Sequence, residues 1–577
     1  MHNAKFDIRA LDSIGLCLNF PGWPKREGKY QVDCHSLEDT LVCSHTVASL
    51  DNHGLKELAI KYFQYADTDE KKLKALVNKA CLRAAKLGWK LGYDKKGKRQ
   101  TAWDYWVPGQ LYDGDKTAET YAVKDTERTM MLWLCYEDLI KEMGVEKAYE
   151  SEMELLPIVF NTENQGLTLN FTKLDPTVQF LNDERIVIKS RIDKLTSAIL
   201  GKNINIDSPD HMKELVYGKK GFNTEVVKRT EKGNPSVDKT VLLDLFKRPT
   251  QEDWQKALLR DILLYKAYGT SIRYIKGYKD LSFPISKKWG RIYPSLNQIG
   301  AATNRFTSSN PNGQNVGKKD KVKFGKDDEI TIPKLRDVFG PYPGKIWYSI
   351  DYSQIELRVF SCVSKEQSLI DALEAGYDFH GFVASRIFNK PLDKVEDSER
   401  TIAKNVNFAL IFGASPRKVN ATAGIPNAYE LFSGQFPNAS RFMKEVIEYV
   451  KQNGHVWTMD GYKLDVPYSS PYKGVNYMVQ GTAGRIIKSA MRKLKKESWF
   501  DPAEINIILQ IHDELIFEVR KYGPLNTPYY IRKIMDTMEE AGREMGVNCP
   551  VSTEVISKDW GHGQEIEVTE TEFILAA

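Results

Sequence analysis

Two acidic residues, each at the end of an apolar run, are the most chemically informative feature of the sequence. Asp351 follows the run 345–350, and Asp513 follows the run 505–511. An ionised carboxylate at the end of a buried strand is costly unless cations or hydrogen-bond donors meet it, so this position favours a functional site. One such Asp can equally cap a following helix. Two together can hold a pair of Mg²⁺ ions about 4 Å apart, the arrangement that stabilises both oxygens of an in-line phosphoryl displacement.

The surrounding patterns predict the elements that position these carboxylates. Residues 345–351 have the short apolar run of a buried strand, and the apolar spacing becomes helical from Gln354 onward. Residues 505–519 are apolar, then charged, then alternating. This order predicts a β-hairpin with the charged residues 512–514 at its tip.

A helix between the two acidic strands carries a second functional pattern. Four residues at i, i+4, i+8 and i+12 share one face of it: Arg400, Lys404, Phe408 and Phe412. Cations can hold a polyphosphate, and aromatic rings can pack on a sugar and a base. The opposite face is an ordinary core stripe. We therefore interpret the first face as a binding surface, because a solvated face rarely carries two Phe residues in line.

Two polar segments are typical of contacts with nucleic acid. Residues 303–315 surround Arg305 with amide and hydroxyl groups and contain few apolar residues, which suits recognition of the minor groove. Residues 476–488 begin a further helix, on which Asn476 and Gln480 can touch a template or primer strand. The small residues of that helix can also serve simple helix packing.

Composition and length describe a multidomain protein without a membrane segment. At 577 residues, with 42% hydrophobic residues and a net charge of +5, the chain is too long for one core. No apolar run is long enough to span a bilayer, and the N-terminus lacks the apolar core of a signal peptide. The seven cysteines form no CxxC pair, so we expect reduced thiols and a cytoplasmic protein.

The order of patterns also suggests how the chain is organised. Residues 1–155 alternate apolar runs with helical stretches, with strands expected at 14–18 and 41–43. Asp175 and Pro176 are a good N-cap and first residue for a long amphipathic helix. This helix leads to a basic, turn-rich tip that suits the gripping of a duplex backbone, although a solvated helical hairpin has the same pattern.

Two further charged segments are predicted as exposed loops. Residues 95–99 are a basic run, and residues 317–329 mix acidic and basic side chains. Neither segment contains enough apolar residues to form a core element.

Taken together, these segments resemble the conserved blocks of the family A (Pol I-like) DNA polymerases. Residues 351–358 are similar to motif A, residues 400–413 to motif B, and His512-Asp513-Glu514 to motif C. The stretches 305–315 and 476–488 resemble two further blocks of the family. The resemblance covers essentially the whole chain.

This resemblance implies an α/β multidomain protein with a right-hand polymerase fold of palm, fingers and thumb. A partial ribonuclease H-like 3′–5′ exonuclease domain precedes the hand. The implied boundaries are 1–155 for the exonuclease-like part, 156–265 for the thumb, 266–365 for the first part of the palm, 366–454 for the fingers, and 455–577 for the second part of the palm with the C-terminal tail.

The implied activity is template-directed addition of deoxynucleotides to a primer 3′-hydroxyl with two Mg²⁺ ions, which Mn²⁺ can replace. The implied catalytic residues are Asp351, Asp513 and Lys404, and the implied metal positions are Asp351, Tyr352 and Asp513. Nucleotide contacts are implied for Gln354, Glu356, His380, Arg400, Lys404, Phe408 and Phe412, with Glu356 blocking a ribose 2′-hydroxyl. Contacts with the DNA duplex are implied for Arg305, Gln314, Asn315, Asn476, Gln480 and His512.

The implied partners are primer–template DNA and deoxynucleoside triphosphates, for a monomer of a bacterial or phage-infected cytoplasm. Nothing in the expected thumb identifies a processivity factor or helicase. Three positions depart from the family pattern: Phe412 replaces a Tyr, Asn304 a Gly and Gly313 a Leu. The charged segment 317–329 is an insertion relative to the more compact family pattern.

Acidic residues near the N-terminus resemble parts of a proofreading site. Residues 3–7, with Asp7, are similar to the second exonuclease motif, and residues 121–125, with Tyr121 and Asp125 on one helix face, are similar to the third. The first motif, an Asp-x-Glu that would supply two metal ligands, has no room before Met1. We therefore expect an exonuclease remnant that does not proofread, although the same residues taken alone are ordinary surface acids.

Two alternatives are consistent with part of the pattern. A single-subunit RNA polymerase shares the palm and a similar Arg/Lys helix, but Glu356 and the exonuclease-like N-terminus argue against it. A catalytically inert DNA-binding subunit could retain the fold, but the intact pair Asp351 and Asp513 argues against that alternative.

Overall fold

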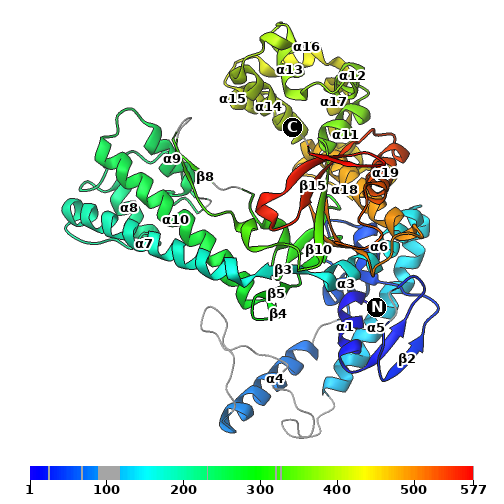
Figure 1. The fold of residues 1–577 in the computed structure, drawn as a ribbon. Helices are drawn as coiled ribbons and strands as arrows, with labels where there is room; N and C mark the ends of the chain where they lie inside the picture. Colours follow the sequence, from blue (N-terminus) through cyan, green and yellow to red (C-terminus); the bar gives the residue numbers. More distant parts are fainter. Residues whose placement is uncertain are drawn as a thin grey trace.

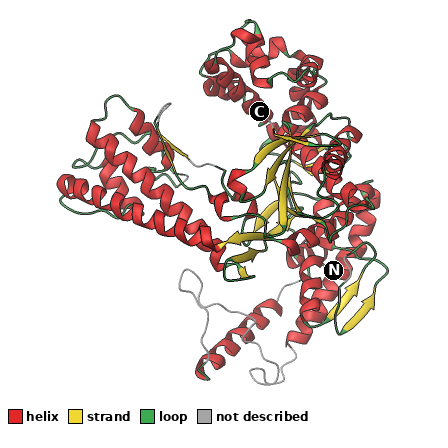
Figure 2. Cartoon of the chain, in the orientation of Figure 1, coloured by secondary structure: helices red, strands yellow, loops and turns green. Residues whose placement is uncertain are grey.

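The computed structural model describes residues 1–23, 26–65, 69–88, 117–230, 232–318, 321–324 and 328–575. Helices form an N-terminal region, a long arm and a separate cluster, and strands gather between them (Figures 1 and 2). The basic run 95–99 lies outside the described residues. None of the described helices is both long and apolar enough to cross a membrane.

The N-terminal region is mainly helical. Its elements are α1 (Ala4–Ser13), β1 (Leu16–Asn19), β2 (Tyr30–Asp33), α2 (Thr40–Val47), α3 (Leu55–Phe63), α4 (Asp69–Lys86), α5 (Thr117–Glu142) and α6 (Glu146–Gln165). The strand predicted at 14–18 corresponds to β1, which pairs with β2 in parallel. The strand predicted at 41–43 is wrong, because these residues belong to α2, where Asp39 caps the first turn by accepting from the Leu41 N–H. A short apolar run does not distinguish a buried helix from a strand.

The arm consists of long antiparallel helices that extend away from the sheet (Figure 1). Its elements are α7 (Phe171–Leu200), α8 (Pro209–Tyr217), α9 (Lys239–Lys247) and α10 (Asp253–Asp280), and β3 (Leu167–Asn170) leads into it. The predicted helix start at Asp175–Pro176 is wrong. The helix begins five residues earlier, where the Asn170 side chain accepts from the Thr172 N–H at 3.0 Å. Pro176 lies inside α7 as its sixth residue, where its missing N–H removes one backbone hydrogen bond of the helix.

A six-stranded antiparallel sheet forms the centre of the molecule, in the order β13-β14-β10-β15-β16-β17. Its strands are β10 (Lys345–Tyr352), β13 (Ile505–Ile511), β14 (Glu514–Arg520), β15 (Val551–Ile556), β16 (Gln564–Val568) and β17 (Phe573–Leu575). The predicted strand at 345–351 and the hairpin at 505–519 are both confirmed. Every residue of β13 is buried, because α6 and neighbouring helices cover this end of the sheet.

The remaining helices form a cluster above the sheet and a layer behind it (Figure 1). The cluster contains α12 (Gln367–Glu374), α13 (Phe379–Ile387), η4 (Leu392–Lys394), α14 (Asp397–Ile411), α15 (Pro416–Ala423), α16 (Ala428–Gln435) and α17 (Pro437–Asn453). The layer contains α11 (Ile355–Ser364), η5 (Pro471–Lys473), α18 (Gly474–Lys496) and α19 (Pro528–Glu544), whereas η6 (Trp560–His562) packs against η3 (Leu335–Val338). The helix predicted around Arg400 is confirmed as α14, and a capping box formed by Glu396 and Glu399 begins it.

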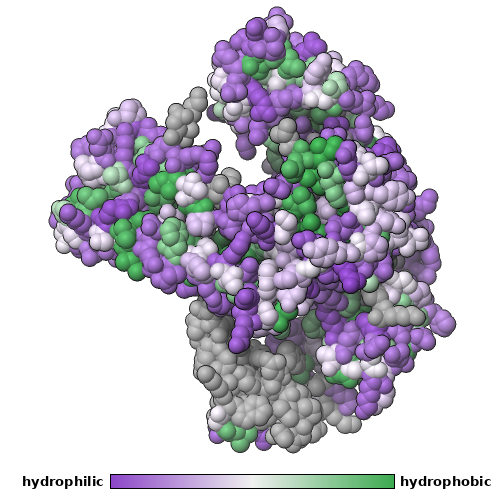
Figure 3. Space-filling view, viewed as in Figure 1, coloured by the Kyte–Doolittle hydropathy of each residue, from purple (hydrophilic) through white to green (hydrophobic). Residues whose placement is uncertain are grey.

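Short strands connect the arm to the sheet. They are β4 (Phe283–Pro284), β5 (Trp289–Ile292), β6 (Ser295–Asn297), β7 (Thr307–Ser309), β8 (Lys321–Lys323) and β9 (Glu329–Thr331), with η2 (Gly313–Asn315) and η3 (Leu335–Val338), and β11 (His455–Trp457) and β12 (Lys463–Asp465) form a separate hairpin. Figure 3 shows that the molecule is hollowed between the arm and the helical cluster. The central sheet lies at the base of this hollow (Figure 1).

The segment 317–329, predicted as an exposed loop, is instead partly folded against the arm. Strands β8 and β9 pair as an antiparallel hairpin. Phe324 is fully buried, and its ring centroid lies 5.5 Å from that of Phe246 on α9. Arg260 of α10 lies over the same ring and pairs with Asp328 at 2.9 Å. The described part of this segment is therefore anchored by two buried apolar side chains, Val322 and Phe324, which its composition does not reveal.

Truncation of Phe324 should release the hairpin from the arm. Replacing a fully buried Phe by Ala costs about 3–5 kcal/mol, and proteolysis that follows fast local opening tracks this free energy. We expect Phe324→Ala to raise the rate of tryptic cleavage between residues 317 and 331 about 100-fold. Phe283→Ala is the matched control, since Phe283 is 65% exposed. An unchanged cleavage rate in Phe324→Ala would show that the hairpin is not held by this contact.

Candidate functional site

The structure brings Asp351 and Asp513 together, as the sequence predicts. Strand β10 pairs with β14 so that Asp351 lies opposite Glu514, and the backbone N–H of Tyr352 donates to the carbonyl of Asp513 at 3.1 Å. His512 and Asp513 form a two-residue loop between β13 and β14. His512 has a φ of 50°, as tight hairpin turns require. The turn therefore presents Asp513 beside the end of β10.

Burial and mutual repulsion make this group of carboxylates costly to ionise. Burial, followed by the charges of Glu514 and Asp513, raises the pKa of Asp351 from 3.8 to about 7. Burial also raises the pKa of Asp513, while Arg305 opposes that rise. Like charges in a poorly solvated site favour a nearby cation. Bound divalent cations would therefore relieve the repulsion among these carboxylates.

Two residues near the carboxylates were missed as site residues. Glu514 is buried and accepts a hydrogen bond from the Ser349 hydroxyl. The Nζ of Lys318 lies 3.8 Å from the Oε2 of Glu514, and its charge opposes the rise in the pKa of Asp351. The position of Glu514 beside Asp513 in the predicted hairpin tip was an available signal. For Lys318 the sequence offered no such signal, because this residue belongs to the segment predicted as a loop.

Arg305 connects the carboxylates to the next helix. Its Nη2 donates to the Oε1 of Glu356 at 2.5 Å and to the Oδ1 of Asp513 at 3.3 Å. Glu356 lies in the first turn of α11, which begins immediately after Gln354. Gln354 is exposed and has a φ of 54°. The strand-to-helix turn at 352–355 thus aims Glu356 toward Arg305.

The polar residues predicted to contact DNA lie around Arg305. Arg305, Gln314 and His512 line one small pocket together with Gly484. The Nε2 of Gln314 donates to the Oε1 of Gln510 at 2.9 Å, and Asn315 follows it, exposed, at the end of η2.

One face of α18 continues this polar surface. Asn476 and Gln480 precede Gly484 at helical spacing on α18, and a Cβ at Gly484 would lie 3.3 Å from Arg305 Cγ. The Nδ2 of Asn476 is buried and has no hydrogen-bond partner within the described chain. Such an orphaned donor is available to a ligand.

The predicted face of α14 is also present. The Arg400 guanidinium donates to both oxygens of Asp378 at 2.7 Å, and Lys404 is exposed one turn later. The rings of Phe408 and Phe412 stack with centroids 6.3 Å apart. Both rings line a pocket of about 740 Å³ between α14, α15 and α17. Phe412 is the C-cap rather than part of the helix.

His380 lies next to this face. Its ring centroid is 5.6 Å from that of Phe408, and its Nδ1 is 3.1 Å from the amide nitrogen of Asn407. Burial lowers the pKa of His380, partly opposed by Asp378. His380 is therefore held in place beside Phe408 rather than exposed as a surface histidine.

The side chain of Tyr352 is not at the site. It is 3% exposed, and its hydroxyl donates to the carbonyl of Met538 on α19 at 2.6 Å. The Tyr352 side chain therefore does not reach the carboxylates, because alternation along β10 turns it away from the face that carries Asp351. Only its backbone carbonyl is available to a metal ion.

The acidic residues of the N-terminal region do not form a carboxylate cluster in the described chain. Asp7 lies on α1, where burial raises its pKa to about 6. Tyr121 and Asp125 lie on α5, as predicted, but the Tyr121 hydroxyl is 3.2 Å from Lys56 Nζ and Asp125 pairs with Arg128 at 2.8 Å. None of the hydrogen bonds or ion pairs of the described residues joins Asp7 to Asp125.

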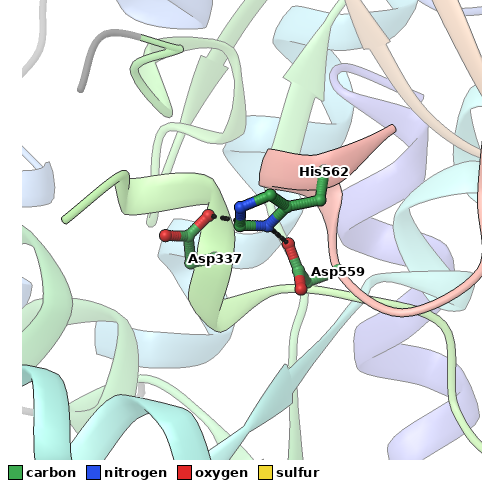
Figure 4. Close-up of side chains that lie close together, drawn as sticks. All are labelled: Asp337, Asp559 and His562. Carbon is green, nitrogen blue, oxygen red and sulfur yellow. Dashed lines mark hydrogen bonds and ion pairs between the residues drawn. The ribbon is translucent and has the colours of Figure 1, made fainter. Parts of the chain in front are cut away.

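One group of three metal-ligating side chains occurs in the described residues, and it lies elsewhere. His562 of η6 lies between Asp337 and Asp559 (Figure 4). Its Nδ1 is 2.6 Å from an oxygen of Asp559 and 3.6 Å from an oxygen of Asp337. Lys173 already pairs with Asp559. The group therefore works as an ion-pair contact between η3, η6 and α7 without requiring a metal.

Neutralising Asp351 should stabilise the protein in the absence of metal. Because the folded pKa is raised from 3.8 to about 7, ionised Asp351 destabilises the fold increasingly as pH rises from about 4 to 7, and constantly above pH 7. We expect the free energy of unfolding of Asp351→Asn to exceed that of the unmodified protein by about 1–3 kcal/mol at pH 8, and this difference to vanish near pH 4. Chemical denaturation in chelator at several pH values measures this, with the exposed Asp393→Asn as control. A destabilised Asp351→Asn at pH 8 would contradict the electrostatic account.

Comparison with known proteins agrees with this geometry. The model of "DNA polymerase family A" matches residues 179–562. DNA polymerase I of Rhizobium leguminosarum is 26% identical over 549 residues, which are 90% of this chain and 48% of that protein. DNA polymerase I of Chloroflexus aurantiacus is 29% identical over 464 residues, which are 76% of this chain and 46% of that protein. The chain thus spans about half the length of the curated relatives it matches.

The fold is also similar to that of a solved structure. The POL domain of Pol1 from M. smegmatis, described as a complex with DNA primer-template and dNTP, superposes with a TM-score of 0.72 and 20% sequence identity, covering 97% of this chain and 85% of that one. This likeness supports the mixed α/β fold. Because the family match also covers more than half of the sequence, the chain belongs to DNA polymerase family A.

Proposed function

We propose that this protein is a template-directed DNA polymerase that adds deoxynucleotides to a primer 3′-hydroxyl by two-metal-ion phosphoryl transfer. The observation that carries the proposal is the pair Asp351 and Asp513 at adjoining strand ends, with Arg305 joining Asp513 to Glu356. A carboxylate pair at the base of a hollow, with a cationic and aromatic helix face nearby, supplies the parts that phosphoryl transfer requires.

The donor set fits divalent metal ions. Carboxylate oxygens are the ligands that Mg²⁺ prefers, with Mn²⁺ a close substitute. Burial, followed by the like charges of Glu514 and Asp513, raises the pKa of Asp351. Asp351 and Asp513, with the carbonyl of Tyr352, would hold the ions. When bound, the ions activate the primer hydroxyl and neutralise the charge of the leaving pyrophosphate.

The face of α14 binds the incoming nucleotide. Arg400 and Lys404 hold the triphosphate, with His380 as a further contact, and Lys404 stabilises the charge that develops during transfer. Phe408 packs on the deoxyribose and Phe412 on the base. The triphosphate competes with Asp378 for Arg400, because Asp378 accepts the two charge-assisted hydrogen bonds that Arg400 donates.

Selection of the sugar depends on α11. Glu356 occupies the space of a ribose 2′-hydroxyl, and Gln354 lies beside it at the start of the helix. Arg305 anchors the Glu356 carboxylate at 2.5 Å, which keeps this steric gate in position.

The duplex lies in the hollow between the arm and the helical cluster. Arg305, Gln314 and Asn315, together with Asn476, Gln480 and His512, follow the primer–template strands. In this assignment 156–265 is the thumb, 266–365 and 455–577 form the palm with the C-terminal tail, and 366–454 forms the fingers. The proposed site draws all its residues from one chain, which supports a monomer. The cytoplasmic location rests on the seven cysteines, which form no CxxC pair.

We also propose that the exonuclease-like part, residues 1–155, does not proofread in this chain. Hydrolysis by two metal ions needs several carboxylates at one point. Asp125 is instead paired with Arg128, and Tyr121 contacts Lys56. The described residues bring no third metal-ligating side chain to Asp7 or Asp125.

Primer extension tests the polymerase assignment. With an end-labelled primer, a longer DNA template, Mg²⁺ and deoxynucleotides, the protein should lengthen the primer. Asp351→Ala and Asp513→Ala should each lower the rate about 1,000-fold, equivalent to ~4 kcal/mol of lost transition-state stabilisation. Asp393→Ala, at an exposed position in the helical cluster, is the matched control and should extend the primer normally.

Two outcomes of this experiment would replace the assignment. Ribonucleotides incorporated as fast as deoxynucleotides would favour an RNA polymerase. DNA binding without extension by the unmodified protein would favour an inert DNA-binding subunit.

The same labelled primer tests the absence of proofreading. Without nucleotides, and with either Mg²⁺ or Mn²⁺, the primer should keep its length, because the paired side chains of α5 do not assemble a hydrolytic site. Electrophoresis of matched and mismatched 3′-ends measures this. Shortening that is abolished in Asp125→Ala but retained in Asp351→Ala would show that the N-terminal region does hydrolyse DNA.

A further inference from the structure

A buried ionic cluster lies directly behind Arg305. Glu152 of α6 and Lys488 of α18 have fully or almost fully buried side chains, with 0% and 2% exposure. We call this group the Glu152 cluster; its members are Ser151, Glu152, Gln298, Asn304, Asp460, Arg485 and Lys488. The cluster joins the N-terminal region to α18 and to the loop 298–306.

The Glu152 carboxylate is the centre of the cluster. Its Oε1 accepts from the Nη1 of Arg485 at 2.6 Å and from the Nζ of Lys488 at 2.7 Å. Its Oε2 accepts from the Nε2 of Gln298 at 2.8 Å. Arg485 also donates to Asp460 at 2.6 Å. Every charge is therefore paired, which a buried ionic group requires.

Lys488 extends the cluster to the loop that carries Arg305. Besides Glu152, its ammonium donates to the carbonyl of Gln298 at 2.8 Å and to the Oδ1 of Asn304 at 2.5 Å. These three acceptors match the three donors of an ammonium group. Burial lowers the pKa of Lys488 to about 8, opposed by Glu152. Lys488 thus fixes both ends of the segment 298–304.

Asn304 holds the backbone immediately before Arg305. It is fully buried and has a φ of 57°, a conformation that Asn tolerates better than most residues. On the other side, the Arg305 side chain lies against Gly484, one helical turn before Lys488 on α18; a Cβ there would be 3.3 Å from Arg305 Cγ. Arg305 is therefore confined between the cluster and α18.

Stability alone does not account for such a cluster. Replacing buried ion pairs by well-packed apolar groups is often neutral or stabilising, whereas charges and directional hydrogen bonds specify one geometry. The geometry specified here is that of the loop 298–306. Arg305 is the side chain of that loop that reaches Glu356 and Asp513.

We propose that Asn304, Lys488 and Glu152 are positioning residues that hold Arg305 against the primer-terminal base pair. The inference rests on the proposed polymerase function and deepens it. In this proposal α6, which precedes the arm in the chain, contributes to the polymerase site through Glu152. Loss of the cluster leaves the catalytic carboxylates intact but lets Arg305 move.

A double-mutant cycle between Asn304 and Arg305 tests this. Asn304→Gly keeps a residue that accepts positive φ and removes one acceptor from Lys488. We expect it to lower the single-turnover rate of nucleotide addition about 10- to 100-fold, with an unchanged apparent Kd for the nucleotide. In the Arg305→Ala background, Asn304→Gly should cause no further loss, because both changes remove the same interaction.

Matched variants separate positioning from loss of structure. Asn389→Gly is the control, since Asn389 is exposed and has a φ of 49°, and its rate should not change. Thermal melting establishes that each variant is folded. Glu152→Gln, which keeps the shape of the side chain and removes its charge, should reproduce the rate loss of Asn304→Gly and also be silent in Arg305→Ala.

The outcomes are distinguishable. Equal losses from Asn304→Gly in the presence and absence of Arg305 would overturn the inference and leave the polymerase function standing. A rate of nucleotide addition by Asn304→Gly equal to that of the unmodified protein would also overturn the inference. Absence of primer extension by the unmodified protein would overturn the proposed function, and the inference with it.

Discussion

The repulsion among carboxylates at the adjoining ends of β10 and β14 is the constraint on which the rest of the site depends. Strand pairing places Asp351 opposite Glu514 and beside Asp513, and burial keeps water from screening them. The resulting rise in the pKa of Asp351 to about 7 is a destabilising feature of the fold. Functional sites commonly retain such costs where a ligand relieves them.

The cations of the site are balanced by carboxylates of the same chain. Arg305 pairs with Glu356 and Asp513, and Arg400 pairs with Asp378. These contacts keep the basic side chains oriented before a substrate arrives. In the proposed function, phosphate or base groups must replace these existing charge-assisted hydrogen bonds, which sets a threshold for binding.

The departures from the family pattern have structural explanations. Asn304, in place of a Gly, keeps the left-handed backbone and adds an acceptor for Lys488. Gly313, in place of a Leu, lies where even a Cβ would be 3.0 Å from Leu509. The insertion at 317–329 is anchored to the arm through Phe324 and brings Lys318 to Glu514.

The sequence by itself determined the elements whose periodicity is strong and whose formation depends on neighbouring residues. The strand before Asp351, the hairpin around Asp513 and the face of α14 from Arg400 to Phe408 follow from alternation or helical spacing, which are properties of neighbouring residues. Weak local signals failed at Leu41–Cys43, at Pro176 and at the β8–β9 hairpin, where capping or a distant apolar partner decided the outcome.

Only the tertiary structure decided which distant groups meet. Glu152 and Lys488 are far apart in the chain, and no spacing rule connects them, yet they form one buried pair behind Arg305. The approach of Lys318 to Glu514 is of the same kind. The physical reason is that burial and electrostatic pairing depend on distance in space, and the sequence records only distance along the chain.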